Sequence, residues 1–150
     1  MSVVNWGIIG LGKIANKFAL AFKDVKNSKL ISVASKNKDK LDLFKRQFNI
    51  DSSFCYNEYE NILFNKEIDI IYIALPHSLH FEWINKSIDN KKNVLTEKPA
   101  TVSLDEIKKI NIKLAQNKIF FAEGFMYRFH PQTAFLIKIL QQNEIGELKQ

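Results

Sequence analysis

Cysteine, long apolar runs and targeting signals are scarce or missing in this sequence, and each shortage excludes a class of protein. The one cysteine among 150 residues, Cys55, cannot form an internal disulfide and has no neighbours at metal-ligand spacing. No apolar run approaches the length of about 18 residues that a membrane span needs, and the N-terminus lacks the pattern of a secretion signal. These absences predict a cytoplasmic protein with no membrane partner.

Arginine is also scarce, although the formal net charge is +6 at pH 7. Only Arg46 and Arg128 carry a guanidinium, the group best suited to bidentate contacts with phosphate and guanine. The densest basic stretch, residues 37–46, is interleaved with Asp39 and Asp42, as on a solvated helix surface. The charge therefore favours a lysine-rich surface, and no nucleic-acid partner is expected.

Short apolar runs alternate with segments of helical periodicity along most of the chain. The apolar runs have the length of strands and lie at residues 3–9, 30–34, 52–56, 68–75, 93–96 and 119–125. Between the first two, Ile14, Phe18 and Phe22 recur at four-residue steps, which is typical of a helix with one apolar face. This alternation predicts an α/β fold, a doubly wound and mostly parallel sheet with crossover helices.

Residues 125–150 depart from that alternation. They contain a predicted amphipathic helix over about 132–142, with Phe135 on its apolar side, and end in a segment at 147–150 that resembles the start of a strand. We therefore expect a first domain at residues 1–124, followed by a segment and a helix that lead toward a further domain.

Glycine is rare, yet three of the five glycines fall within residues 7–12. Gly10 and Gly12 begin a G-x-G-x-x-A pattern that ends at Ala15, where the first predicted strand turns into the first predicted helix. Gly10 permits a tight turn, Gly12 lets a pyrophosphate approach the backbone, and Ala15 allows close helix–strand packing. Phosphates would then lie on the free N–H groups of the helix N-terminus. The same pattern also occurs as a purely structural turn, but its context favours a dinucleotide site that comprises Gly10, Gly12, Lys13 and Ile14.

The end of the second predicted strand bears on the choice of dinucleotide. NAD-binding domains carry a carboxylate there for the ribose 2′-hydroxyl, whereas this strand ends in Ser35 and Lys36, and the first carboxylate is Asp39. A hydroxyl followed by a cation suits a 2′-phosphate, which favours NADP over NAD. If Lys36 is only a solvated loop lysine, the preference stays open. The missing carboxylate also counts against an S-adenosylmethionine-dependent enzyme.

Two further strand ends carry polar or constrained residues, and in a parallel sheet ligands collect at such ends. These residues are Leu75, Pro76, His77 and His80 after the fourth predicted strand, and Glu97, Lys98 and Pro99 after the fifth. The two histidines are three positions apart, but no third ligand lies nearby and a turn before a helix would separate them. No metal is therefore expected.

Four motifs, G-x-G-x-x-A, PHSLH, VLTEKPA and EGFMYRFHP, resemble in order and spacing the nucleotide-binding half of the glucose-fructose oxidoreductase / inositol dehydrogenase (Gfo/Idh/MocA) family. The resemblance covers essentially the whole chain, and Glu-Lys-Pro is its most specific part. It implies that Lys98 lies beside the nicotinamide and the reacting carbon of the substrate, with a cis peptide bond before Pro99. It also implies that His77 lies near the ribose and nicotinamide, and that His80 lies at the next helix start.

The cofactor site expected from position and resemblance comprises Leu75, Pro76, His77, His80, Glu97, Lys98 and Arg128, besides the glycine turn and the second strand end. Two members have a structural alternative: His80 as a capping or packing residue, and Arg128 as a residue that only holds its own segment. For Lys98 the chemistry agrees with the resemblance, because an ammonium stabilises the negative charge that develops on a carbinol oxygen as hydride leaves.

The resemblance also implies a longer protein. Family members have roughly twice this length, and their second domain supplies the substrate wall and the main dimer surface. The full-length protein is then expected to be a homodimeric or larger NADP- or NAD-dependent dehydrogenase acting on a small molecule, a sugar, polyol or diol-like carbinol. Residues 1–150 alone are expected to bind cofactor without turnover. The alternative is a catalytically inactive, dinucleotide-sensing regulatory protein of the same family.

Overall fold

A six-stranded parallel sheet forms the centre of the computed structural model, which describes residues 3–147 and residue 149. The strands are β1 (Val4–Ile9), β2 (Ser28–Ala34), β3 (Cys55–Tyr56), β4 (Ile70–Ile73), β5 (Asn93–Thr96) and β6 (Phe121–Glu123). Their order across the sheet is β3-β2-β1-β4-β5-β6. The chain thus winds outward from β1 to one edge and returns to wind outward from β4 to the other, which confirms the predicted doubly wound fold.

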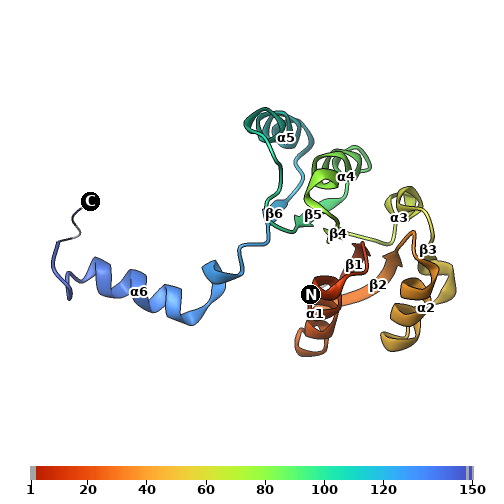
Figure 1. Ribbon diagram of the computed structural model, residues 1–150, viewed down its shortest axis with the longest axis horizontal. Coiled ribbons are helices and arrows are strands. Elements are labelled where there is room, and N and C mark those ends of the chain that lie inside the picture. The colour runs from red at the N-terminus through yellow and green to blue at the C-terminus, as the bar shows by residue number, and fades with distance from the viewer. Residues whose placement is uncertain (1–2, 148, 150) are drawn as a thin grey trace.

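Helices cover both faces of this sheet. They are α1 (Lys13–Leu20), α2 (Lys38–Gln47), α3 (Tyr59–Phe64), α4 (His77–Asp89) and α5 (Leu104–Asn117), with the short 3₁₀ turns η1 (Ala21–Asp24) and η2 (Ser52–Phe54). A third 3₁₀ turn, η3 (Met126–Phe129), and the helix α6 (Pro131–Gln141) follow the last strand and do not cover the sheet (Figure 1). Figure 1 shows α1 and α2 below the strands, and α3, α4 and α5 above them. No helix in the described part of the chain is long and apolar enough to cross a membrane.

The core has two halves, one on each face of the sheet. Ile8 and Tyr72 pack among residues of α1 and α2, whereas Ile9, Ile71 and Ile73 pack among residues of α3, α4 and α5. Successive strand residues point to opposite faces, and here both faces are covered. This explains why the run around β4 is apolar without alternation.

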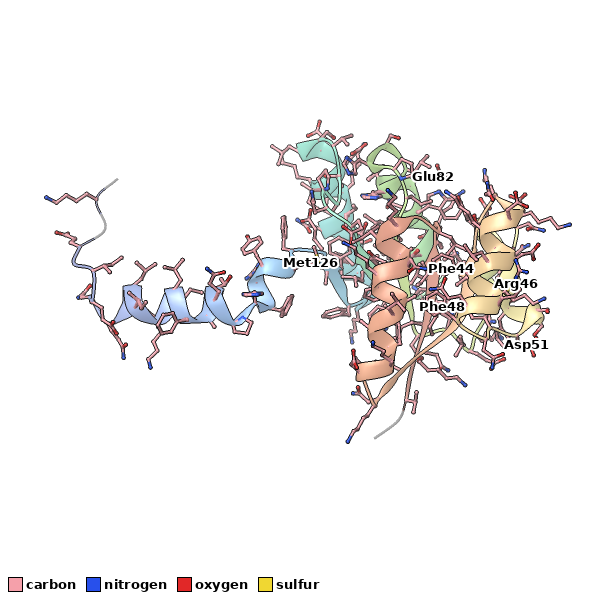
Figure 2. The ribbon with its side chains drawn as sticks, turned by 60° about the horizontal axis from the view of Figure 1, so that its bottom comes forward. Phe44, Arg46, Phe48, Asp51, Glu82 and Met126 are labelled. Carbon is pink, nitrogen blue, oxygen red and sulfur yellow. The ribbon has the colours of Figure 1, made fainter. Side chains whose placement is uncertain are left out.

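The basic stretch at residues 37–46 forms the start and outer side of α2. Phe44 on the inner side packs against Phe48, with ring centroids 5.2 Å apart, while Arg46 points outward (Figure 2). Asp42 is also exposed. The amphipathic pattern therefore accounts for these charges as helix surface.

The predicted strands at residues 52–56, 68–75 and 119–125 are shorter in the structure, as β3, β4 and β6, and local contacts explain the first and the last of these differences. Residues 52–54 form the turn η2 because the Asp51 carboxylate accepts hydrogen bonds from the Ser53 backbone N–H (2.9 Å) and hydroxyl (2.7 Å). This local capping outcompetes strand pairing, so that only Cys55 and Tyr56 join the sheet. The run at 119–125 is likewise reduced to β6, since the chain turns immediately after it, where the Phe125 N–H bonds the Glu123 carbonyl at 2.8 Å.

After β6 the chain leaves the α/β unit. Figure 1 shows α6 extending away from the sheet, and Figure 2 shows Met126 where the connection begins. The helix lies one residue from its predicted bounds, and its apolar side chains Phe135, Leu136 and Ile137 are exposed. The strand expected at 147–150 falls partly outside the described residues.

Candidate functional site

The carboxyl ends of five strands lie side by side along one edge of the sheet. The register pairs Ile9 with Ala34 on one side and with Ile73 on the other, and continues from Ile73 to Thr96 and from Thr96 to Glu123. The segments after these residues therefore leave the sheet at one level. The structure brings together on this edge the predicted site residues Gly10, Gly12, Ser35, Lys36, Leu75, Pro76, His77, Glu97 and Lys98. Arg128 lies further out, exposed, in η3.

Gly10 occupies a position that no other residue type fits. Its φ is +88°, and a Cβ built on it would lie 2.6 Å from the Ala74 carbonyl oxygen and 2.8 Å from a methyl of Leu75. The Gly10 N–H also donates to the Ala34 carbonyl at 3.0 Å. The tight turn after β1 thus requires glycine for its backbone conformation and for its contact with the end of β4.

Gly12 differs, because nothing in the structure crowds it. It is the N-cap residue of α1 in extended conformation, and a Cβ on it would meet no atom within 4 Å. Among the residues that the structure describes, no side chain caps α1. Its first turn carries no acidic residue, and the first N–H groups of a helix have no intrahelical partners. This open, electropositive space, bordered by exposed Lys13 and half-buried Ile14, fits a phosphate group.

At the end of β2 the chain presents a hydroxyl and an ammonium. Ser35 is 4% exposed and its hydroxyl oxygen accepts a hydrogen bond from the Asn37 N–H at 3.1 Å. Lys36 is exposed, with its Nζ 5.6 Å from the centre of the Tyr59 ring. Glu60 follows Tyr59, and a hydrogen bond from Lys86 (2.7 Å), with a smaller contribution from Lys36, holds its pKa below the usual value.

After β4, α4 begins at His77 with Pro76 as its N-cap residue, and His77 is exposed. His80 is instead completely buried, and its ring nitrogens lie 2.8 Å from the Leu75 carbonyl oxygen and 2.7 Å from the Pro99 carbonyl oxygen. The ring therefore ties the end of β4 to the turn after β5, as in the packing alternative. Within the described residues no three histidine, cysteine or acidic side chains gather as for a metal ion.

The turn after β5 carries Lys98. Its first residue is anchored to β4, because the Glu97 N–H donates to the Ile73 carbonyl at 3.0 Å. The Lys98–Pro99 peptide bond is cis, as the resemblance implies, and the Lys98 side chain is exposed.

Two residues that the sequence analysis did not single out also bind this turn. The Tyr72 hydroxyl of β4 donates to the Glu97 carboxylate at 2.5 Å, and the Glu123 carboxylate of β6 accepts from the Ala100 N–H at 2.8 Å. Burial, reinforced by the bond to Glu97, raises the pKa of Tyr72 well above its usual value, so that the hydroxyl stays a donor. One signal for Tyr72 was present, since a tyrosine inside an otherwise aliphatic buried strand needs a partner for its hydroxyl.

Comparison with known proteins agrees with this geometry. The model of an oxidoreductase family with an NAD-binding Rossmann fold, the Gfo/Idh/MocA family, matches residues 4–125. The trans-1,2-dihydrobenzene-1,2-diol dehydrogenase of Xenopus tropicalis is 28% identical over 146 residues, which are 96% of this chain and 44% of that protein. The chain thus spans less than half the length of this relative.

Two solved structures show the same arrangement. A 3-ketoreductase from Actinomadura kijaniata, in complex with TDP-benzene and NADP, superposes with a TM-score of 0.89 at 26% identity, covering 97% of this chain and 46% of that one. The scyllo-inositol dehydrogenase of Lactobacillus casei, with bound NAD(H) and scyllo-inositol, gives a TM-score of 0.90 at 24% identity, covering 97% and 43%. The second similarity supports the fold alone.

Proposed function

Because the chain belongs to the Gfo/Idh/MocA family of oxidoreductases with an NAD-binding Rossmann fold, we propose that it is the cofactor-binding part of an NAD(P)-dependent dehydrogenase. The observation that carries this proposal is the open space at Gly12, where a Cβ would meet nothing within 4 Å at the N-terminus of α1. A pyrophosphate placed there would receive hydrogen bonds from the backbone and the favourable field of the helix.

Each segment of the sheet edge then has its own task. The glycine turn with Lys13 and Ile14 holds the pyrophosphate, and the residues after β4 border the nicotinamide half. When bound, the nicotinamide supplies hydride transfer to or from the substrate carbon. The Lys98 ammonium stabilises the negative charge that develops on the substrate oxygen, and its Nζ carries the proton that is exchanged with this oxygen. The substrate class proposed is a sugar, polyol or diol-like carbinol, in keeping with the names of the relatives.

We assign residues 1–124 to the cofactor domain and residues 125–150 to a connection toward a second domain. The supporting observations are the exposed apolar residues of α6, such as Phe135 at 63% exposure, and the greater length of the relatives. In this assignment the second domain covers α6, completes the substrate pocket and supplies the contacts of a homodimer or larger oligomer.

For the cofactor we propose a preference for NADP over NAD. The support is local: Lys36 is exposed at the end of β2, and the nearest following carboxylate, Asp39, lies in the first turn of α2. A 2′-phosphate would gain a charge-assisted hydrogen bond from the ammonium, worth about 1.5–3 kcal/mol, or roughly 10- to 100-fold in affinity.

Titration with NADPH and NADH, followed by nicotinamide fluorescence, tests both proposals. NADPH is expected to bind at least about tenfold more tightly than NADH, and Lys36→Glu is expected to remove or invert that difference. Lys23→Glu, with the same change of charge in η1 away from the sheet edge, serves as the matched control and should leave it intact. Equal affinities in the wild type would overturn the NADP preference, and absence of binding by either dinucleotide would overturn the proposed function.

A further inference from the structure

The turn from Glu97 to Ala100 is held by side chains of two strands that flank β5. At the first residue of the turn, the Glu97 carboxylate accepts a hydrogen bond of 2.5 Å from the hydroxyl of Tyr72 in β4. At the last residue of the turn, the Ala100 N–H donates a hydrogen bond of 2.8 Å to the carboxylate of Glu123 in β6. Lys98 lies between these two attachments.

Tyr72 is suited to hold the first attachment rigidly. It is only 2% exposed, and its ring packs against Phe18 of α1 with centroids 4.1 Å apart. The ring is therefore fixed by the core that also supports the glycine turn, since Leu11 and Ala15 belong to the same cluster. The hydroxyl transmits that fixed position to Glu97.

The hydrogen bond between Ala100 and Glu123 is likewise supported by its surroundings. The Gly124 N–H, next to Glu123, donates to the Thr96 carbonyl at 2.8 Å, which locks the end of β6 to β5. A Cβ on Gly124 would lie 3.2 Å from that carbonyl oxygen and 3.5 Å from the Glu97 carboxylate. The chain after β6 thus lies directly against the turn, which lets the Glu123 carboxylate reach the Ala100 N–H.

We propose that Tyr72 and Glu123 are positioning residues, which hold the two ends of the Glu97–Ala100 turn and thereby direct the Lys98 ammonium toward the nicotinamide and the substrate. This inference rests on the proposed function of Lys98. Within the described residues, none of the ion pairs involves Lys98, so its placement depends on the backbone that carries it. Misplacement of a reacting group by about 1 Å can cost about 100-fold in rate, which gives such backbone anchors a direct effect on chemistry.

The test follows the Lys98 amine itself by NMR, on protein whose lysines have been reductively methylated with ¹³C. The Lys98 resonance is assigned by its loss in Lys98→Arg. In the wild type, saturating NADPH is expected to shift this resonance, whereas 2′,5′-ADP, which lacks the nicotinamide, is expected to leave it in place. Tyr72→Phe and Glu123→Ala should each reduce the NADPH-induced shift by at least half, with the NADPH dissociation constant within about twofold of the wild-type value.

Conservative and remote variants separate positioning from general destabilisation. Glu123→Gln keeps an oxygen that accepts the Ala100 N–H, and should restore most of the shift. Tyr56→Phe removes another tyrosine hydroxyl from the sheet, one that accepts from the Asn65 side chain at 3.2 Å far from the turn, and should leave the shift unchanged. Tyr72→Phe retains the ring that packs on Phe18, so that a folded variant is expected, and Glu123→Ala provides an independent second arm.

The outcomes distinguish this inference from the proposed function. If NADPH binds but the wild-type Lys98 resonance does not move, the proposed catalytic role of Lys98 and the positioning role both fall, whereas the proposed cofactor binding stands. If the wild-type resonance moves and both Tyr72→Phe and Glu123→Ala retain the full shift, the positioning role alone is overturned.

Discussion

Gly12→Val is expected to abolish dinucleotide binding while leaving the α/β unit folded. The valine side chain would project into the space proposed for the pyrophosphate, where a Cβ meets no protein atom within 4 Å. Gly12 has φ −93° and ψ −173°, an extended conformation that valine adopts readily, so the backbone should tolerate the change. We expect at least about a 100-fold loss of NADPH affinity, because the ligand loses its hydrogen bonds to the helix N-terminus. Fluorescence titration measures the affinity, and thermal unfolding checks the fold.

Gly10→Ala serves as a control, because it is expected to lower the stability of the fold, whereas Gly12→Val is expected to lower only the affinity for NADPH. Here the Cβ would lie 2.6 Å from the Ala74 carbonyl oxygen, on a residue with φ +88°, so the substitution should destabilise the protein itself by about 2 kcal/mol or more. A Gly12→Val variant that binds NADPH as the wild type does would show that the pyrophosphate lies elsewhere.

Lys98→Ala in the full-length protein is expected to lower kcat by about 100- to 1,000-fold, since the variant would lose the charge that we propose to stabilise the substrate oxygen. The dissociation constant for NADPH should change little, because in the proposed binding mode other segments hold the pyrophosphate and the ribose. Steady-state kinetics over a panel of sugars, polyols and diols measures kcat, and fluorescence titration measures the dissociation constant for NADPH.

Lys108→Ala is the matched control for this substitution, since it removes an exposed lysine from α5 and should leave kcat unchanged. Full activity in Lys98→Ala would refute the catalytic role. A wild-type full-length protein that binds NADPH tightly but turns over no substrate of the panel would instead favour the dinucleotide-sensing alternative.

The parts of the fold that local patterns encode were predictable from the sequence. Apolar runs without alternation indicated strands covered on both faces, and the structure places successive residues such as Ile71 and Tyr72 in opposite halves of the core. The glycine turn was predictable for the same reason, since the requirement at Gly10 arises from the backbone itself. The ends of strands were less predictable. Residues 52–54 were expected to pair with the sheet, but Asp51 caps a turn there.

Contacts between distant segments were not predictable in this way. Tyr72 and Glu97 are 25 positions apart, and Ala100 and Glu123 are 23 apart, so no local spacing marks either pair. His80 illustrates the same limit. The sequence analysis left it open whether His80 is a cofactor residue or a capping or packing residue. Its two ring nitrogens face the carbonyls of Leu75 and Pro99, which only the folded sheet brings together.

A crystal structure of this protein with NADPH bound would place the pyrophosphate relative to Gly12 and the nicotinamide ring relative to Lys98. We expect the pyrophosphate on the N–H groups at the start of α1, beside Gly12, and the nicotinamide ring within contact distance of the Lys98 side chain. Density for the dinucleotide at another edge of the sheet, or a nicotinamide ring turned away from Lys98, would show that the proposed binding mode is wrong.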